Sequence, residues 1–374
     1  MSKYKILTIV GTRPELIKMC RVIALFEKHT DHVLVHTGQN FDHQLNQVFF
    51  DELGIRQPDF YLGAAGASSV ATIADILVKV EDVLLKVRPD AILIYGDTNS
   101  GMSVIAAKRL KIPVFHMEAG NRCFDQRVPE ELNRKVIDHL SDINMVLTEH
   151  ARRYLIAEGL PQDRIFKVGS HMQEVLEHFE PSIRGSDILE RLDLTAGSYF
   201  LVSSHREENV DAPDRLAALL DSLNGLAETY GNPVIVSTHP RTRKRMEEMQ
   251  QRDVNPLISF LPPFGFFDYV NLQMQAACVI SDSGTITEEG ALLGLRAVTI
   301  RQAHERPEGM DAGTLIMCDL DREDVLGAVE IAMAGDVPRP APVNDYEGGA
   351  VSRKVLNIVL SYIGFVNRVV WRKA

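Results

Sequence analysis

The stretch AILIYGDT at residues 91–98 decides the fold class of this 374-residue chain. Five apolar residues, Ala91–Tyr95, are followed at once by a glycine, a carboxylate and a hydroxyl. A continuous apolar run of this length is typical of a strand buried on both faces of a parallel sheet. Polar groups directly after such a strand lie at the carboxyl edge of the sheet, where α/β folds bind their ligands. The stretch therefore predicts an α/β domain and the edge that carries its site.

Apolar runs of the same kind recur along the chain, separated by segments with helical periodicity. The other predicted strands of the first half are Ile6–Val10, His32–His36, Val114–Met117, Ile143–Leu147 and Ile165–Val168. The second series is Tyr199–Ser203, Pro233–Ser237, Ile258–Leu261, Cys278–Ser281 and Ala297–Ile300. We therefore predict an α/β protein of two Rossmann-like domains that face a cleft.

The domain boundaries follow from composition and from the tail. We predict a first domain of residues 1–172 plus 352–374 and a second domain of residues 173–351, with a Pro- and Gly-rich linker at 335–349. Apolar residues recur at helical spacing between Val355 and Val366. This stripe predicts a C-terminal helix that packs back on the first domain.

Composition narrows the classes of function. The net charge is −11 and the chain lacks a dense Lys/Arg run, which argues against nucleic-acid binding. The four cysteines form no CxxC pair, so we expect reduced thiols and neither a disulfide framework nor a zinc site. The N-terminus lacks signal-peptide features, and polar residues interrupt the apolar tail. We expect a cytoplasmic protein without a membrane span.

Two groups of residues in the first half suggest a site. The turn Gly11–Glu15 begins a helix, where backbone amides attract an anion, and Arg13 and Lys18 add positive charge. The alternative is a tight turn with two solvated cations.

Three acids form the second group. Asp97 and Glu118 each follow a predicted strand, and Glu130 opens a helix. By itself Asp97 could be a helix cap, and Glu130 a cap or a partner of the helix dipole. Because crowding raises the pKa of carboxylates, three acids at one edge suggest proton transfer.

The second half offers a complementary set. His205 follows the first strand of that domain, and either contacts phosphate, transfers a proton or is a satisfied buried histidine. Ser283 and Gly284 form a turn that starts a helix, which is a seat for phosphate. Glu289 lies further along that helix, where it could hold ribose hydroxyls, unless the acids there are caps or solvated. Arg306 adds a cation after a later strand.

In order, these motifs resemble the non-hydrolysing UDP-N-acetylglucosamine 2-epimerase family. The matching segments are GTRPE at 11–15, HTGQN at 36–40, GDT at 96–98, HMEAG at 116–120, PEELNR at 129–134, HRE at 205–207, SDSGTITEE at 281–289 and ERPE at 305–308. The resemblance spans nearly the whole chain. It implies the glycosyltransferase-B architecture, a UDP-sugar substrate, no metal, no redox cofactor and a homodimer.

The resemblance also implies roles for individual residues. Catalysis falls to Asp97, Glu118, Glu130 and His205. Substrate binding, including the UDP part, falls to Arg13, Lys18, Arg206, Tyr269, Ser283, Gly284, Glu289 and Arg306, with Tyr269 near the uracil.

The segment GNRCFDQRVPEELNRKVIDHLSD at 120–142 resembles one branch of this family. That branch converts UDP-2-acetamido-2,6-dideoxy-L-talose to UDP-N-acetyl-L-fucosamine for surface polysaccharides such as capsule or O-antigen. The branch acting on UDP-N-acetylglucosamine typically has a longer loop before PEE and HTGQH instead of HTGQN. Alternatives are that branch, an L-rhamno/L-quinovo branch, a hydrolysing epimerase, a glycosyltransferase of the same architecture and an inactive UDP-sugar sensor.

Overall fold

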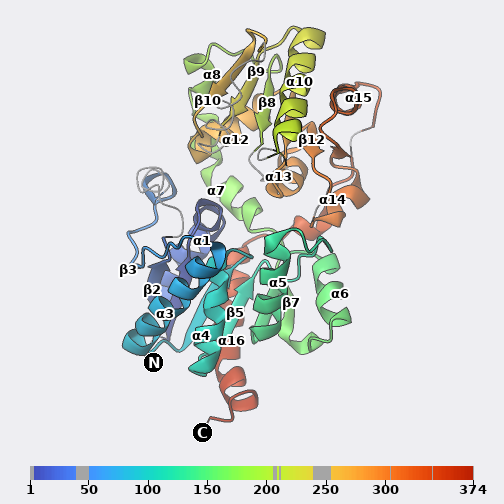
Figure 1. The fold of residues 1–374 in the computed structure, drawn as a ribbon. Coiled ribbons are helices and arrows are strands. Elements are labelled where there is room, and N and C mark those ends of the chain that lie inside the picture. The colour runs from blue at the N-terminus through green and yellow to red at the C-terminus, as the bar shows by residue number, and fades with distance from the viewer. Residues whose placement is uncertain are drawn as a thin grey trace. The chain divides into compact units, whose positions relative to one another are not determined.

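The computed structural model describes residues 4–38, 50–204, 209, 212–238, 254–303, 305–338 and 340–373 (Figure 1). The chain divides into two compact units, unit 1 with Met1–His178 and Asp345–Ala374, and unit 2 with Phe179–Asn344. Each unit is described by itself. The predicted boundaries at 172/173 and 351/352 remain predictions.

Unit 1 is built on a parallel sheet whose strands run in the order β3-β2-β1-β4-β5-β6-β7. The strands are β1 (Lys5–Val10), β2 (Asp31–His36), β3 (Phe60–Tyr61), β4 (Ala91–Tyr95), β5 (Val114–Met117), β6 (Ile143–Val146) and β7 (Ile165–Lys167). All neighbouring pairs are parallel. The predicted strands of this half are confirmed, and β3, a two-residue edge strand, was missed because it is too short to show a pattern.

Helices cover both faces of this sheet. They are α1 (Arg13–His29), α3 (Ser69–Val87), α4 (Val104–Arg109), α5 (Pro129–Leu140), α6 (Glu149–Ala157) and α16 (Val351–Val369). A further helix, α7 (His171–Arg184), begins in unit 1 and ends in unit 2. Apolar side chains of α3 and α4 form one core with the sheet. The predicted tail helix is confirmed as α16, red in Figure 1, which packs on α1 with its buried stripe from Val355 to Val366.

Unit 2 repeats this plan with the strand order β10-β9-β8-β11-β12-β13, again all parallel. Its strands are β8 (Phe200–Ser203), β9 (Val234–Ser237), β10 (Ile258–Leu261), β11 (Cys278–Ser281), β12 (Ala297–Ile300) and β13 (Ile316–Cys318). Its helices are α8 (Ile188–Arg191), α10 (Pro213–Tyr230), α12 (Phe266–Gln275), α13 (Thr285–Leu293), α14 (Pro307–Ala312) and α15 (Arg322–Met333). The prediction of two Rossmann-like α/β units is confirmed.

In each sheet the chain reverses the direction in which it adds strands. This switch lies between β1 and β4 in unit 1 and between β8 and β11 in unit 2. Loops that leave the two strands at a switch diverge to opposite faces, which opens a crevice at the carboxyl edge. The motifs after β1, β4 and β11 therefore stand where this fold class binds ligands. Among the described helices, none has the length and apolarity to cross a bilayer.

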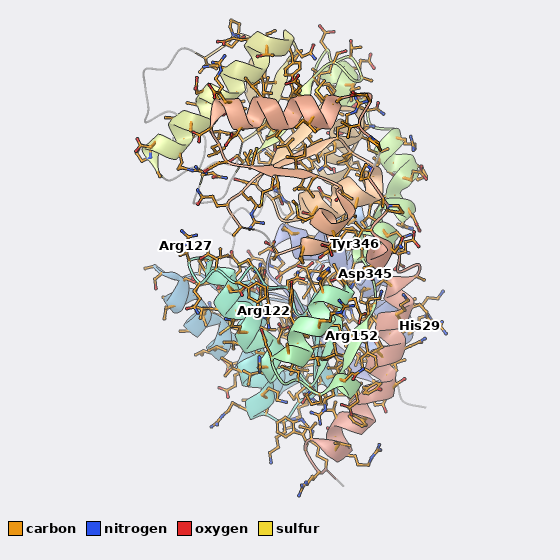
Figure 2. The ribbon with its side chains drawn as sticks, turned by 90° about the vertical axis from the view of Figure 1, so that its right-hand side faces the viewer. His29, Arg122, Arg127, Arg152, Asp345 and Tyr346 are labelled. Atoms are coloured by element: carbon orange, nitrogen blue, oxygen red, sulfur yellow. The ribbon has the colours of Figure 1, made fainter. Side chains whose placement is uncertain are left out.

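The chain returns to unit 1 across the end of β7, where two glycines meet. Gly169 has a φ of +89°, and a Cβ there would lie 2.5 Å from Cα of Gly348. Asp345 fixes the returning segment by accepting from the backbone N–H of Glu149 at 2.7 Å and from Lys167 at 2.6 Å. Figure 2 shows Asp345 and Tyr346 above α6. The close backbone approach explains why residue 169 has no side chain.

We predict that Gly169→Ala lowers the free energy of unfolding of unit 1 by at least about 1–2 kcal/mol, because a Cβ is unfavourable at this φ and collides with backbone. Urea unfolding followed by circular dichroism measures the loss. Gly327→Ala in α15 is the control, since a Cβ there meets no atom within 4 Å. Alanine at 327 should be neutral or stabilising by up to about 1 kcal/mol. Equal stability of both variants would contradict the packing argument.

Candidate active site

The turn after β1 is closed by its own acid, Glu15. One carboxylate oxygen accepts from the backbone N–H of Gly11 at 2.5 Å and of Thr12 at 2.9 Å, and the other bonds the Thr98 hydroxyl at 2.6 Å. The expectation that the amides of this turn are open to an anion is therefore wrong for Gly11 and Thr12, because an internal carboxylate already binds them. The same carboxylate joins the loops that follow β1 and β4 across the switch.

Glu15 belongs to the GTRPE motif, for which the sequence predicts no role of this acid. Burial raises its pKa from 4.5 to about 7, although hydrogen bonds from Thr98, Gly11 and Thr12 act in the opposite direction. The signal that could have found it is the capping spacing, in which Glu15 lies three residues after Thr12.

Glu118, at the end of β5, meets Lys18 from α1. The ammonium of Lys18 lies 2.6 Å from Oε2 of Glu118, and the side chains are only 6% and 10% exposed. The Tyr95 hydroxyl at the end of β4 donates to the same oxygen at 2.5 Å. Lys18, which we expected near the sugar-phosphate region, is thus bound directly to a predicted catalytic acid. Tyr95 was missed because its position inside an apolar strand made it look like core.

Asp97 is held by a cation of its own. Arg134 of α5 donates from Nε to Asp97 at 2.8 Å, and from a terminal nitrogen to Glu131 at 3.1 Å. Asn133 donates to the backbone carbonyl of Asp97 at 2.9 Å. The i, i+3 spacing of Glu131 and Arg134 inside PEELNR could have indicated this bridge.

Glu131 also fixes the loop that precedes α5. Its carboxylate accepts from the backbone N–H of Cys123 at 3.1 Å and of Phe124 at 3.2 Å. Phe124 has a φ of +55° and is 70% exposed. Glu130, the predicted catalytic acid that precedes Glu131, is half-buried in the first turn of α5. The loop is therefore connected to Asp97 through two side chains.

A buried network underlies both acidic turns. His116 of β5 lies 2.9 Å from Asp138 through Nδ1 and 2.8 Å from the Gly96 carbonyl through Nε2. Asp138 also accepts from the backbone N–H of Gly120 and, at 2.7 Å, from Arg122. Figure 2 shows Arg122 in the interior of unit 1. The network fixes the residues that flank Asp97 and Glu118.

In unit 2, Ser283 and Gly284 stand at the start of α13, as predicted. The Ser283 and Thr285 hydroxyls lie 3.0 Å apart. A Cβ on Gly284 would overlap the carboxylate of Glu305, which is paired with Arg301 at 2.9 Å. A buried acid therefore adjoins the expected phosphate seat, and Arg301 neutralises it.

The remaining predicted residues of unit 2 lie around α13. Arg306, at the start of α14, is 3% exposed and lies 3.3 Å from the fully buried carboxylate of Glu288. Glu289 accepts from Gln273 at 2.7 Å. Tyr269 of α12 packs against an apolar cluster near α8. Arg306 thus has a buried carboxylate partner, a contact that the sequence did not suggest.

His205 and Arg206 lie outside the described residues. The residues on either side of that segment, Ser204 and Asn209, both donate to the buried carboxylate of Asp282, at 2.8 and 3.1 Å. Asp282 comes directly before the Ser283-Gly284 turn. The loops that follow β8 and β11 are therefore tied together at the switch of unit 2.

We predict that Glu15→Gln changes the pH dependence of stability. In the wild type Glu15 keeps its proton in the folded state up to about pH 7 but loses it near 4.5 when unfolded. Between these values the folded state binds more protons, so this group makes stability fall as pH rises, by up to about 1.4 kcal/mol per pH unit. Glutamine is neutral throughout and removes the contribution.

Urea unfolding at pH 5, 6, 7 and 8 measures the effect as the difference between wild type and variant. The difference isolates Glu15, because buried His32 and His36, whose pKa values burial lowers to about 4, give stability the opposite slope between pH 4 and 6.5 in both proteins. Glu190→Gln, at an exposed position of α8, is the control. Parallel pH curves for wild type and Glu15→Gln would refute the assignment.

Comparison with known proteins places this geometry in a family. The family model for UDP-N-acetylglucosamine 2-epimerase matches residues 24–360. The structure of UDP-N-acetylglucosamine 2-epimerase from Rickettsia bellii is 56% identical, with a TM-score of 0.91, over 99% of this chain and 100% of that one.

Two further relatives extend the comparison. The Methanocaldococcus jannaschii UDP-GlcNAc 2-epimerase, solved with UDP-GlcNAc and UDP, is 32% identical with a TM-score of 0.89, over 96% of this chain and 99% of that one. The UDP-2,3-diacetamido-2,3-dideoxy-D-glucuronate 2-epimerase of Pseudomonas aeruginosa is 33% identical over 94% of this chain and 98% of its own length. With the family model matched from residue 24 to residue 360, this chain belongs to the UDP-N-acetylglucosamine 2-epimerase family.

Proposed function

We propose that this chain is a non-hydrolysing 2-epimerase of a UDP-linked 2-acetamido sugar. The observation that carries the proposal is the pair of carboxylates at the carboxyl edge of unit 1, each held by its own cation. Asp97 is paired with Arg134 and Glu118 with Lys18. Relatives named as UDP-sugar 2-epimerases support the reaction class.

The proposed reaction eliminates UDP and adds it back. A carboxylate removes the proton from C2, the electrons of that C–H bond form the C1=C2 double bond, and the C1–O bond breaks with UDP leaving as the anion. A 2-acetamidoglycal results. UDP then re-adds at C1 while a protonated acid delivers a proton to the opposite face of C2. Because inversion needs proton carriers on both faces, the acids Asp97, Glu118 and Glu130 fit this route.

Unit 2 is proposed to hold UDP. Backbone amides and hydroxyls at the start of α13 stabilise the departing diphosphate, as preorganised donors do wherever negative charge develops. The residues proposed to contact the nucleotide and the sugar-phosphate region are Arg13, Lys18, His205, Arg206, Tyr269, Ser283, Gly284, Glu289 and Arg306. Arg306 would then bind a phosphate group while it remains paired with Glu288.

The proposed substrate is UDP-2-acetamido-2,6-dideoxy-L-talose, with UDP-N-acetyl-L-fucosamine as the product for surface polysaccharide synthesis. The short loop before PEELNR supports it, and so does Phe124, an exposed aromatic side chain on that loop. A 6-deoxy sugar carries an apolar methyl group, which an aromatic ring contacts favourably. The 56% identity with a UDP-N-acetylglucosamine 2-epimerase makes that sugar the second candidate.

Substrate and route are tested together by proton NMR in D2O. The purified protein is incubated with the L-talo sugar and, in parallel, with UDP-N-acetylglucosamine. Deuterium at C2 of a new epimer from the L-talo sugar supports both proposals. Turnover of the gluco sugar alone keeps the route and overturns the substrate. UDP released without a new epimer indicates hydrolysis, and no exchange with either sugar favours a glycosyltransferase or a sensor.

We predict that Asp97→Asn lowers kcat by about 10²- to 10⁴-fold, the usual loss of a general acid or base, while UDP still binds. Epimer formation by NMR and UDP binding by calorimetry measure the two effects. Asp90→Asn is the matched control, because Asp90 precedes the same strand at its opposite end and accepts from the Lys5 N–H at 2.7 Å. Near-normal turnover by Asp97→Asn would remove Asp97 from the mechanism.

We also propose a homodimer, which the outer face of α3 supports. Val70, Val78 and Leu85 lie on this helix and are 76%, 62% and 54% exposed. Large apolar side chains gathered on one face mark interaction surfaces in soluble proteins. Val78→Asp should therefore shift the protein towards monomer in light scattering after size exclusion, with Val337→Asp, 49% exposed elsewhere, as the control. An unchanged mass for Val78→Asp would exclude α3 as the contact.

A further inference from the structure

The backbone at Glu118 is held in an unfavourable conformation. Its φ is +61°, a left-handed region that is unfavourable for a residue with a side chain. Residues on both sides are fixed by one buried carboxylate, since Asp138 binds the ring of His116 and the backbone N–H of Gly120. A strained residue that its surroundings hold in place is a mark of a functional position.

The side chain of Glu118 is fixed as firmly as its backbone. Two donors reach the same oxygen, the Tyr95 hydroxyl at 2.5 Å and the Lys18 ammonium at 2.6 Å. These donors come from different elements, β4 and α1, and Lys18 also lies 5.4 Å from the centre of the Tyr95 ring. The carboxylate therefore has a defined orientation before any ligand binds.

Several charged or titratable groups face this cluster. Lys18 approaches from α1, Tyr95 from β4 and the ring of His171 from α7, at 5.3 Å edge-on to Tyr95. Glu15 lies one turn before Lys18 on α1. Of the groups that contact Glu118 here, Lys18 supplies charge and Tyr95 a neutral hydroxyl. Removing that hydroxyl therefore deletes its hydrogen bond to Glu118 and takes away no charged group.

We propose that Tyr95 is a positioning residue which, with Lys18, orients Glu118 and keeps it ionised as the base that takes the C2 proton. This inference rests on the proposed epimerase function. A hydrogen bond donated to a carboxylate favours its charged form, and a second donor on the same oxygen fixes its direction. The hydroxyl contributes more to proton removal than to substrate binding, because it acts through Glu118.

The test is Tyr95→Phe, which keeps the ring that packs on His171 and removes only the hydroxyl. A hydrogen bond to a charged group predicts that kcat falls about 10- to 100-fold, with KM little changed. The low-pH limb of the kcat profile should move to higher pH, because Glu118 loses a donor that favours its ionised form.

Tyr199→Phe is the matched control. Its buried hydroxyl donates to the Leu272 carbonyl at 2.6 Å within unit 2, so the variant loses an equivalent bond outside the acid cluster. It should lower stability and leave the pH profile in place. A Tyr95→Phe enzyme with the wild-type profile, or with a loss of kcat and no movement of the limb, would overturn the proposal.

A carboxyl-carbon NMR titration separates this proposal from the proposed function. The protein carries ¹³C-labelled glutamate, and Glu118→Gln assigns the signal. In Tyr95→Phe the Glu118 carboxyl should titrate at higher pH than in the wild type, whether or not any sugar is turned over. If the wild type turns over no UDP-sugar, the proposed epimerase function is wrong. If the Glu118 carboxyl titrates at the same pH in Tyr95→Phe as in the wild type, the proposed role of Tyr95 is wrong.

Discussion

The carboxylate of Asp138 is the interaction on which the candidate site of unit 1 depends. It lies on α5, fully buried, and binds His116, the backbone N–H of Gly120 and the guanidinium of Arg122. Through the ring of His116 it also reaches the Gly96 carbonyl. Gly96 precedes Asp97, and Gly120 follows Glu118 by two residues. One acid that contacts no substrate in the proposed mechanism thus sets the positions of two predicted catalytic acids.

Such a network is tolerable in the interior because its carboxylates are paired with a guanidinium. Asp138 and Glu158 are the acids, and Arg122 binds both, with distances of 2.7 Å to each. The ring of His116 lies between two oxygen atoms, those of the Asp138 carboxylate and the Gly96 carbonyl. Buried ion pairs contribute little net stability, but removal of one partner is severely destabilising. The network therefore contributes geometry more than stability.

In unit 2 a buried carboxylate again fixes the loops at the carboxyl edge of the sheet. Its switch also brings together two loops, those that follow β8 and β11. Asp282, fully buried, accepts from Ser204 after β8 and from Asn209, while it stands directly before the Ser283-Gly284 turn. In both units a buried aspartate ties loops at the carboxyl edge of the sheet. The proposed chemistry needs this rigidity, since proton transfer and stabilisation of the leaving group require donors that are already in place.

The sequence by itself determined the fold class, most of the strands, the tail helix on unit 1 and the edge of each sheet that carries polar residues. These follow from local patterns, because a buried parallel strand is a continuous apolar run and the groups after it have nowhere else to lie. The tertiary structure decided which side chains bind one another. The sequence shows Lys18 and Glu118 as separate motifs 100 residues apart, and the fold makes them an ion pair. It likewise joined Glu15 to Thr98, because this contact depends on which loops the sheet order makes neighbours, and that order is not written in any local pattern.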